Sequence, residues 1–291
     1  MIDLHTHSTA SDGSLSPGAL IRAAADRGLT AIALTDHDTI AGLEEARLEA
    51  ELRGIRFIPG VEISVEPDPE KYPGEFHLLG LGITRPSAAF LEAVDQLARS
   101  RTERNREILD RMNEQGVEAD YEEVRSFSGG HSVGRPHFAR LLIRRKLVKN
   151  VQQAFDRYLA EGKPFYVPKT GMNFDKAVAA IKGSGGIAVL AHPLSLFVAW
   201  GRLPGLIQGL KEKGLDGLEA WHPAAKESAC KRLEALGKSL GLIITAGSDF
   251  HGEARPDRKL GITAGGRKIG EEYLAAIVPR TFQSTSTEKI S

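Results

Sequence analysis

The stretch DLHTHSTASDG, residues 3–13, places two histidines two positions apart after a short apolar run. Successive side chains of a strand point to opposite faces, so His5 and His7 share one face. Two imidazoles side by side have the spacing that a shared metal ion requires. Near the other end of the chain, GSDFH repeats this spacing with Asp249 and His251. Two such pairs favour one metal site over two unrelated pairs of polar strand-end residues.

Length and composition limit the class of protein. A chain of 291 residues is long enough for one α/β barrel with an insertion. Lys plus Arg equal Asp plus Glu at 38 each, so any anion must be held by local clusters. The start of the chain lacks a signal-like pattern and no apolar run spans a membrane, so we expect a soluble, cytoplasmic protein. The single Cys230 excludes an internal disulfide and a cysteine zinc site, and is predicted to be a core residue.

Apolar runs alternate with segments of helical period along most of the chain. The first helix is predicted to begin with Ser16 as N-cap and Pro17 at its first position, and to stop at Gly28. Alternating strands and helices predict parallel βαβ units, and about seven of them predict a barrel. The runs are IDLHTH, LTAIALTDHD, IRFIPGVEIS, FHLLGLGI, GIAVLAHP, GLDGLEAWHP and GLIITAGSDFH.

The alternation breaks in the middle of the chain, where helical patterns follow one another without strands. We therefore predict a discontinuous barrel formed by residues 1–85 and 170–282, with a helical cap inserted at residues 86–169. The polar residues 283–291 are predicted to be a flexible tail.

Other candidate ligands lie in or just after predicted strands, mostly at their C-terminal ends: His37 in TDHD, Glu62 in PGVEIS, His77 in FHLLG and His192 in LAHP. The C-terminal ends of parallel barrel strands share one rim, so these side chains are expected to meet there. A single histidine in such a position is more often a structural residue than a metal ligand. The number of these histidines is what favours a metal site. A carboxylate in an apolar run is costly to bury unpaired, and a metal ion would supply the partner of Glu62.

Two further carboxylates flank His37. Asp36 is predicted to accept a hydrogen bond that orients an imidazole. Asp38 is predicted to cap a helix that begins near Thr39.

With Asp12, the candidates amount to six imidazoles and three carboxylates, which exceed the needs of one tetrahedral ion. Two or three divalent ions are expected. Nitrogen and oxygen donors without thiolate suit manganese, the first expectation, and also iron or zinc.

Together these motifs resemble those of the PHP family, the polymerase and histidinol phosphatase superfamily, in the family's order. The resemblance implies a distorted seven-stranded β/α barrel, a trinuclear metal cluster and phosphoester hydrolysis. It implies Glu62 as a carboxylate bridging two ions, and catalytic roles for Glu62, Asp249, His192 and Asp12. The implied ligands are His5, His7, Asp12, His37, Glu62, His77, His192, Asp249 and His251.

The helical insertion narrows the resemblance to small bacterial members with a cap, which include 3′,5′-nucleoside bisphosphate phosphatases and a 5′-to-3′ exoribonuclease. We expect a phosphatase that removes the 3′-phosphate of such a bisphosphate. A 5′-to-3′ exoribonuclease on short phosphorylated RNA and a histidinol-phosphate-type phosphatase remain alternatives. An amidohydrolase is a further alternative, because that class also begins with H-x-H, but it needs a lysine on a strand to bridge its metal ions. A non-catalytic metal-binding module is another alternative, but such a module is expected to have lost several of the ligands.

The cap is expected to supply selectivity. The spacing of Leu97, Arg101, Arg104, Ile108 and Met112 puts two arginines on an apolar helix face. They either clamp a second phosphate or extend to solvent. Further predicted substrate contacts are Asn105, His131, Ser132, Arg135, Lys169 and, with an open role, His222.

The expected partner is a small nucleotide with two phosphates or a short single-stranded RNA, with no membrane and no obligate protein partner. Phe127, Phe138 and Tyr166 are candidates for stacking on bases. The basic run at residues 144–146 is predicted to be solvated.

Overall fold

Seven short strands build the centre of the molecule. The computed structural model describes residues 1–128 and 133–281. The strands form one sheet whose order follows the chain from β1 to β7. Their bounds are Ile2–Asp3 (β1), Ala31–Leu34 (β2), Arg56–Ser64 (β3), His77–Leu81 (β4), Ile187–Leu190 (β5), Gly217–Trp221 (β6) and Ile243–Ala246 (β7).

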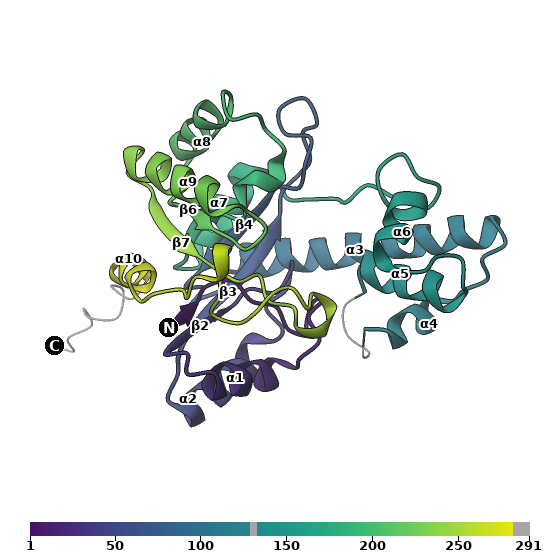
Figure 1. Cartoon of the computed structure of the whole chain (residues 1–291), viewed down its shortest axis with the longest axis horizontal. Helices are drawn as coiled ribbons and strands as arrows, with labels where there is room; N and C mark the ends of the chain where they lie inside the picture. The colour runs from purple at the N-terminus through teal and green to yellow at the C-terminus, as the bar shows by residue number, and fades with distance from the viewer. Residues whose placement is uncertain (129–132, 282–291) are drawn as a thin grey trace.

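Helices cover the outside of this sheet, as Figure 1 shows. They are α1 (Pro17–Asp26), α2 (Leu43–Arg53), α7 (Phe174–Gly183), α8 (Leu203–Glu212), α9 (Glu227–Ser239) and α10 (Glu272–Thr281). The predicted first helix is confirmed: the Ser16 side chain accepts a hydrogen bond from the Ala19 amide, and Gly28 follows with a positive φ of 77°. Its apolar face, including Leu20 and Ile21, is buried against β2 and α2.

The sheet is nearly closed into a barrel. Past the ends of β1 and β7 the backbones continue side by side, with His7 N donating to Phe250 O at 2.9 Å and Asp249 N donating to His5 O at 2.9 Å. The expected seven-stranded β/α barrel is thereby confirmed. The closure also brings the first and last motifs of the sequence into direct contact.

One strand departs from the expected parallel arrangement. β4 runs antiparallel to both β3 and β5. The connection between β3 and β4, residues 65–76, contains no helix, whereas the connection between parallel neighbours usually contains one. Because β4 is reversed, its first residue His77 lies at the rim, opposite Ser64 at the end of β3. The expectation that strand C-terminal ends carry the ligands is wrong for this strand.

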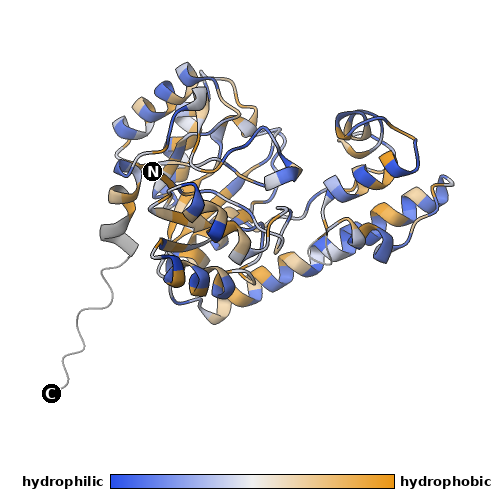
Figure 2. Ribbon diagram, turned by 60° about the horizontal axis from the view of Figure 1, so that its bottom comes forward, coloured by the Kyte–Doolittle hydropathy of each residue, from blue (hydrophilic) through white to orange (hydrophobic). Residues whose placement is uncertain are grey.

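Between β4 and α7 the described chain is helical: α3 (Ala88–Glu114), α4 (Tyr121–Ser126), α5 (Arg135–Arg144), α6 (Val151–Ala154) and the π-helical turn η1 (Phe155–Leu159). The first turns of α3 pack on the barrel through Phe90 and Val94. Its later residues Ile108 and Met112 belong to a separate core with Phe138. Figures 1 and 2 show this long helix leading away from the barrel into the cap.

Smaller expectations also have outcomes. Cys230 is fully buried in the barrel core, and residues 144–146 are exposed, as predicted. The predicted tail, residues 283–291, lies outside the described residues. None of the helices in the described ranges is long and apolar enough to cross a membrane. The division of the chain at residues 86 and 169 stays a prediction.

Candidate metal centre

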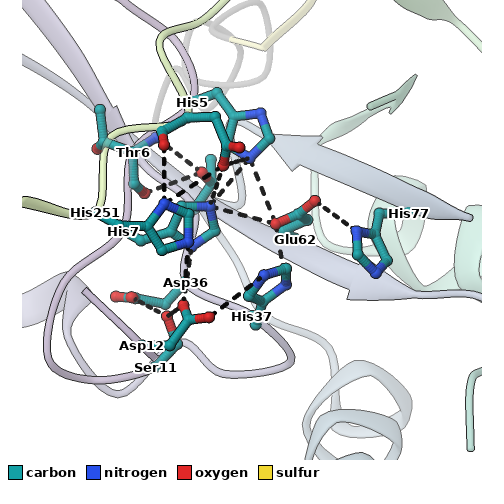
Figure 3. Close-up of polar contacts among 12 residues, drawn as sticks. His5, Thr6, His7, Ser11, Asp12, Asp36, His37, Glu62, His77 and His251 are labelled. Carbon is teal, nitrogen blue, oxygen red and sulfur yellow. Dashed lines mark hydrogen bonds and ion pairs between the residues drawn. The ribbon is translucent and has the colours of Figure 1, made fainter. Parts of the chain in front are cut away.

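Glu62 occupies the middle of the rim, as Figure 3 shows. It lies inside β3, and its side chain is buried. One carboxylate oxygen, Oε2, is 3.0 Å from His37 Nδ1, 3.3 Å from His7 Nε2 and 3.4 Å from His5 Nε2. The other, Oε1, is 2.8 Å from His192 Nε2 and 2.9 Å from His77 Nδ1. Each oxygen therefore faces its own set of imidazoles, which is the position of a bridging ligand.

The remaining two carboxylates lie on either side of His251. Asp12 Oδ1 is 3.3 Å from His251 Nε2, and Asp12 Oδ2 is 4.0 Å from His37 Nε2. Asp249 Oδ1 is 3.3 Å from His7 Nε2 and 3.5 Å from His5 Nε2. The structure thus brings together all nine side chains that the sequence nominates, from segments more than 240 residues apart.

Four groups of these side chains have ligand atoms within 4.8 Å of one another. Glu62 belongs to two of the groups, and so does His7. The groups are His7, Asp12, His37 and His251; His5, Glu62 and His192; His5, His7 and Asp249; and His37, Glu62 and His77.

The donor set fits divalent ions. Ligand atoms about 2.1 Å from a shared ion lie roughly 3.0–3.4 Å apart in octahedral or tetrahedral geometry, which matches most of the separations around Glu62. Three buried atoms have no hydrogen-bond partner among the described residues: His7 Nδ1, His37 Nδ1 and Glu62 Oε2. Close contacts among buried acceptors without hydrogen bonds are costly unless a cation lies between them.

Electrostatics at the rim favour the unprotonated forms of Glu62 and His77, whereas neighbouring carboxylates outweigh burial and raise the pKa values of His5, His192 and His251. Burial by itself raises the pKa of the Glu62 carboxyl, but His37, His77 and His5 outweigh burial and hold this pKa well below its usual range. Burial and the neighbouring Lys169 ammonium lower the pKa of His77 to about 4. A free carboxylate and a neutral imidazole both offer lone pairs to a metal.

Glu219, in β6, is a supporting residue that we did not predict from the sequence. Its Oε1 lies 3.0 Å from His5 Nδ1, and its Oε2 accepts from the His192 amide at 2.7 Å. It therefore fixes the ring of one ligand and the backbone of another. The signal was present: like Glu62, it is a carboxylate within an apolar strand run.

Asp36 has a different role from the predicted one. It accepts hydrogen bonds from the Ser8 amide at 2.8 Å, from Ser8 Oγ at 2.6 Å and from Ser11 Oγ at 2.6 Å, and contacts no imidazole by a hydrogen bond among the described residues. The loop of residues 8–11 turns back over it. Asp36 thus holds the loop that carries Asp12, rather than an imidazole.

The prediction for Asp38 is also wrong. The helix begins later, at Leu43, with Gly42 as its N-cap. Asp38 accepts instead from the Ser64 amide at 2.7 Å and pairs with Arg101 Nη2 at 2.5 Å. Its φ of 52° turns the chain sharply after His37, so its side chain points to β3 and the cap rather than along a helix axis.

His222, whose role the sequence left open, contacts Asp249. Its Nε2 lies 3.2 Å from Asp249 Oδ2, and its Nδ1 accepts from the Ala224 amide at 3.2 Å. Acceptance at Nδ1 places the proton on Nε2, so His222 donates to the carboxylate. It orients a predicted ligand rather than lying loose in a loop.

Arg101 and Arg104 differ in the structure. Arg101 is paired with Asp38, whereas Arg104 is 8% exposed and its Nε has no hydrogen-bond partner. Among the described residues, no carboxylate forms an ion pair with Arg104. The alternative that Arg104 merely extends to solvent is therefore wrong.

The other predicted cap contacts are scattered. Lys169 Nζ is 3.2 Å from His77 Nε2, and Arg135 pairs with Glu75 at 3.1 Å. Asn105 donates to the Val133 carbonyl at 2.8 Å. His131 and Ser132 lie outside the described residues.

The three candidate stacking residues lie in different surroundings in the structure. Phe138 is fully buried in the cap core, so the prediction that it stacks on a base is wrong. Phe127 packs against the same core and lies 5.8 Å from the Arg144 guanidinium. Only Tyr166 of the three lines a cavity beside the centre, about 540 Å³ in volume, together with Phe155.

Comparisons with known proteins place the chain in a family. The PHP domain family model matches residues 3–167. A 5′-3′ exoribonuclease of Haemophilus influenzae is 36% identical over 250 residues, covering 86% of this chain and 89% of that protein. A 3′,5′-nucleoside bisphosphate phosphatase of Chromobacterium violaceum is 34% identical over 263 residues, covering 90% and 91%.

Solved structures show the same architecture. A Bifidobacterium adolescentis protein described as a metal-dependent phosphoesterase superposes with a TM-score of 0.83 at 26% identity, covering 96% of each chain. A Chromobacterium violaceum protein described as an amidohydrolase, with bound sulfate and no metal, gives 0.82 at 32% identity, covering 97% of this chain and 98% of that one. The strands β1 to β7 contain no lysine that would bridge metals as in amidohydrolases. By its motifs, its fold and these matches, the chain belongs to the PHP family.

Proposed function

We propose that this chain is a metal-dependent phosphoesterase that converts 3′,5′-nucleoside bisphosphates, such as adenosine 3′,5′-bisphosphate, to the nucleoside 5′-monophosphate and phosphate. The observation that carries this choice is the buried Arg104 guanidinium, with which no carboxylate of the described residues forms an ion pair. It lines a small pocket with Arg101, Lys169 and Asp38, the last of which is paired with Arg101. Lys169 also reaches His77 of the proposed metal centre. A cationic pocket next to the centre suits a substrate with a second phosphate.

The electrostatics of this pocket support an anion as its occupant. Burial, together with the Arg101 and Arg135 charges, lowers the pKa of Arg104 to about 10, although the carboxylates of Asp38 and Glu75 act in the opposite direction. A buried guanidinium next to like charges is destabilised, and a bound phosphate would relieve both effects.

The nine rim side chains would hold two or three divalent ions, with manganese as the first candidate. When bound, such ions lower the pKa of a water molecule and balance the charge of the transition state. The barrel residues hold the ligands in place: Glu219 fixes His5, and His222 fixes Asp249. The cap residue Arg104 would hold the 5′-phosphate, so that the 3′-phosphate lies over the centre. Positioning of this kind contributes several kcal/mol to catalysis.

A 5′-to-3′ exoribonuclease is the second candidate, and the cavity of about 540 Å³ between barrel and cap favours it. Its wall includes Tyr166, Phe155 and Phe197, and Phe197 is 75% exposed. Exposed aromatic rings beside a phosphate centre suit stacking of bases. Both reactions break the bond between phosphorus and the 3′ oxygen, so they share the predicted catalytic residues Glu62, Asp249, His192 and Asp12.

The test compares three substrates on the manganese-loaded protein: adenosine 3′,5′-bisphosphate, histidinol phosphate and a 5′-phosphorylated RNA oligomer. Released phosphate and released mononucleotide are measured separately. We expect phosphate from the bisphosphate at the highest kcat/KM of the three. The absence of phosphate release from the bisphosphate would overturn the proposal, and mononucleotide release alone would establish the exoribonuclease.

A further inference from the structure

A second buried guanidinium lies in the loop after β7. The Arg258 side chain is 6% exposed, and neither its Nε nor its Nη1 has a hydrogen-bond partner in the part of the chain that the structure describes. Within the described ranges, the one acid in ion-pair distance is Asp257, whose Oδ2 is 3.2 Å from Nε but whose side chain is 71% exposed. The carboxylate nearest to this buried cation is therefore largely exposed, and it compensates little of the free energy that burying the guanidinium costs.

Arg258 and Arg255 line a cavity of about 360 Å³ at the predicted metal centre. The Arg258 amide donates to the Arg255 carbonyl at 3.0 Å, so one turn carries both arginines. The wall of the cavity also includes His192, Asp249, His251, Glu75 and Glu219. The cavity therefore combines predicted ligands and carboxylates with two arginines.

The arginine wall is distinct from the cap pocket. No residue of the cap helices lines the cavity of Arg258, and no residue after Thr170 lines the pocket of Arg104. The centre thus has one cationic site contributed by the cap and a second contributed by the barrel itself.

We propose that Arg258, assisted by Arg255, binds the backbone phosphate that follows the scissile phosphate of an oligonucleotide. The inference rests on the proposed function, because it takes the cap pocket as the site of the 5′-phosphate and the metal centre as the site of the phosphate attacked. Water attacks phosphorus, the bond to the 3′ oxygen of the first nucleotide breaks, and that oxygen leaves with a proton. The scissile phosphate stays on the second nucleotide, whose own 3′ side continues away from the cap.

The count of phosphates supports an oligonucleotide in this cavity. A bisphosphate has two phosphates, which the cap pocket and the centre already take. A 5′-phosphorylated trinucleotide has a third, and the unpartnered guanidinium is suited to it by bidentate hydrogen bonding. The other lining residues include Pro193, Leu194 and the exposed Phe197, an apolar surface on which a base can lie.

The test measures kcat/KM of the wild type and of Arg258→Gln on adenosine 3′,5′-bisphosphate and on 5′-phosphorylated di- and trinucleotides. We expect the wild type to prefer the trinucleotide over the dinucleotide by about tenfold, the effect of one charge-assisted contact. In Arg258→Gln, the loss on the trinucleotide should exceed the loss on the bisphosphate by about tenfold or more. Lys259→Gln, an exposed neighbour with the same change of charge, should show no such difference.

A binding measurement separates this inference from the proposed function. Fluorescence anisotropy with chelator-treated protein should show tighter binding of a labelled trinucleotide than of a dinucleotide, and Arg258→Gln should abolish the difference. If Arg258→Gln does not fold, the exposed Arg255→Gln must reduce the same preference. Hydrolysis of the bisphosphate without any dependence on oligonucleotide length overturns the inference alone. Loss of all phosphate release overturns the proposed function, while the binding difference still decides the role of Arg258.

Discussion

The barrel rim and the cap treat buried charge in opposite ways. At the rim, Glu62 is surrounded by five imidazoles within 3.4 Å. In the cap, Arg104 is also buried, but no carboxylate of the described residues forms an ion pair with it. The rim gathers donors that need a cation, and the cap presents a cation that needs an anion. Under the proposed function, the chemistry therefore belongs to the rim and the selectivity to the cap.

The two regions also differ in how the backbone holds the side chains. Most of the predicted ligands lie on strands or just after them, where the paired backbone holds them; His37, for example, forms a bridge with Glu62. Asp12 lies instead in the loop that Asp36 holds. The cap arginines project from the single long helix α3, which belongs partly to the barrel core and partly to the cap core. Four experiments would break or sharpen this contrast.

The largest effect is expected at the centre of the rim. Glu62→Gln removes the charge that faces five imidazoles, and kcat should fall by about a thousandfold or more, since metal stabilisation of the transition state is worth several kcal/mol. Metal content, measured by elemental analysis, should fall with it. Glu66→Gln, an exposed neighbour of β3, serves as the control. Full metal content and near-normal kcat in Glu62→Gln would contradict a bridging role.

The second effect separates the cap from the rim. Arg104→Ala should lower kcat/KM on adenosine 3′,5′-bisphosphate by about 10- to 100-fold, the range for charge-assisted hydrogen bonds, and spare metal content. Turnover of a simple aryl phosphate, which has no second phosphate, should change far less. Arg106→Ala on the exposed side of the same helix is the matched control. Equal losses on both substrates would count against a clamp.

The third effect concerns the support of the rim. Glu219→Gln keeps an oxygen for His5 Nδ1 but removes the charge, and should weaken metal affinity or activity by roughly 10- to 100-fold. Titration with metal under limiting conditions measures the affinity. Glu212→Gln, exposed on α8, should leave it unchanged. An unaltered titration curve for Glu219→Gln would show that orientation of His5 does not depend on this carboxylate.

The smallest effect is on the stability of the cap. Burial lowers the pKa of His137 to about 4, and its Nδ1 accepts from the Gly134 amide at 2.9 Å. The unfolded chain binds this proton at higher pH than the folded chain, so the stabilisation is complete above pH ~6.5 and is lost as the pH falls toward 4. The free energy of unfolding should drop by at most about 2 kcal/mol between pH 7 and pH 5 from this group.

Urea unfolding of the wild type and of His137→Gln at both pH values measures that contribution. The variant should show a smaller drop than the wild type, because the other titrating groups are common to both. Parallel pH dependences for the two proteins would rule out His137 as the origin.

Much of the fold was predictable because local rules agree with it. The Ser16 cap, the apolar runs and their spacing predicted a seven-stranded α/β barrel with a helical insertion. The reversed β4 was not predicted, since its run of apolar residues reads the same in either direction. The sequence between β3 and β4 has no helical pattern, which could have indicated the reversal. The regular alternation of strands and helices elsewhere nevertheless favoured a parallel strand.

At the site, the sequence predicted which side chains gather at the rim better than it predicted which residues contact one another. The side chains of the i, i+2 pairs lie close together as predicted, because strand geometry fixes which face they share. The partners of Asp36, Asp38 and Phe138 were mispredicted, because each depends on segments distant in sequence or on core packing that no local pattern encodes.

The sequence by itself determined the class of fold, the set of nitrogen and oxygen donors and the presence of a cap, since these follow from periodicity and residue chemistry. Only the tertiary structure decided that Arg101 pairs with the buried Asp38, that Arg104 pairs with no described carboxylate and that Arg258 pairs only with the exposed Asp257. The physical reason is that the energy of a charge depends on what surrounds it in space. Three arginines of the same chemistry therefore become one buried structural ion pair and two candidate phosphate sites.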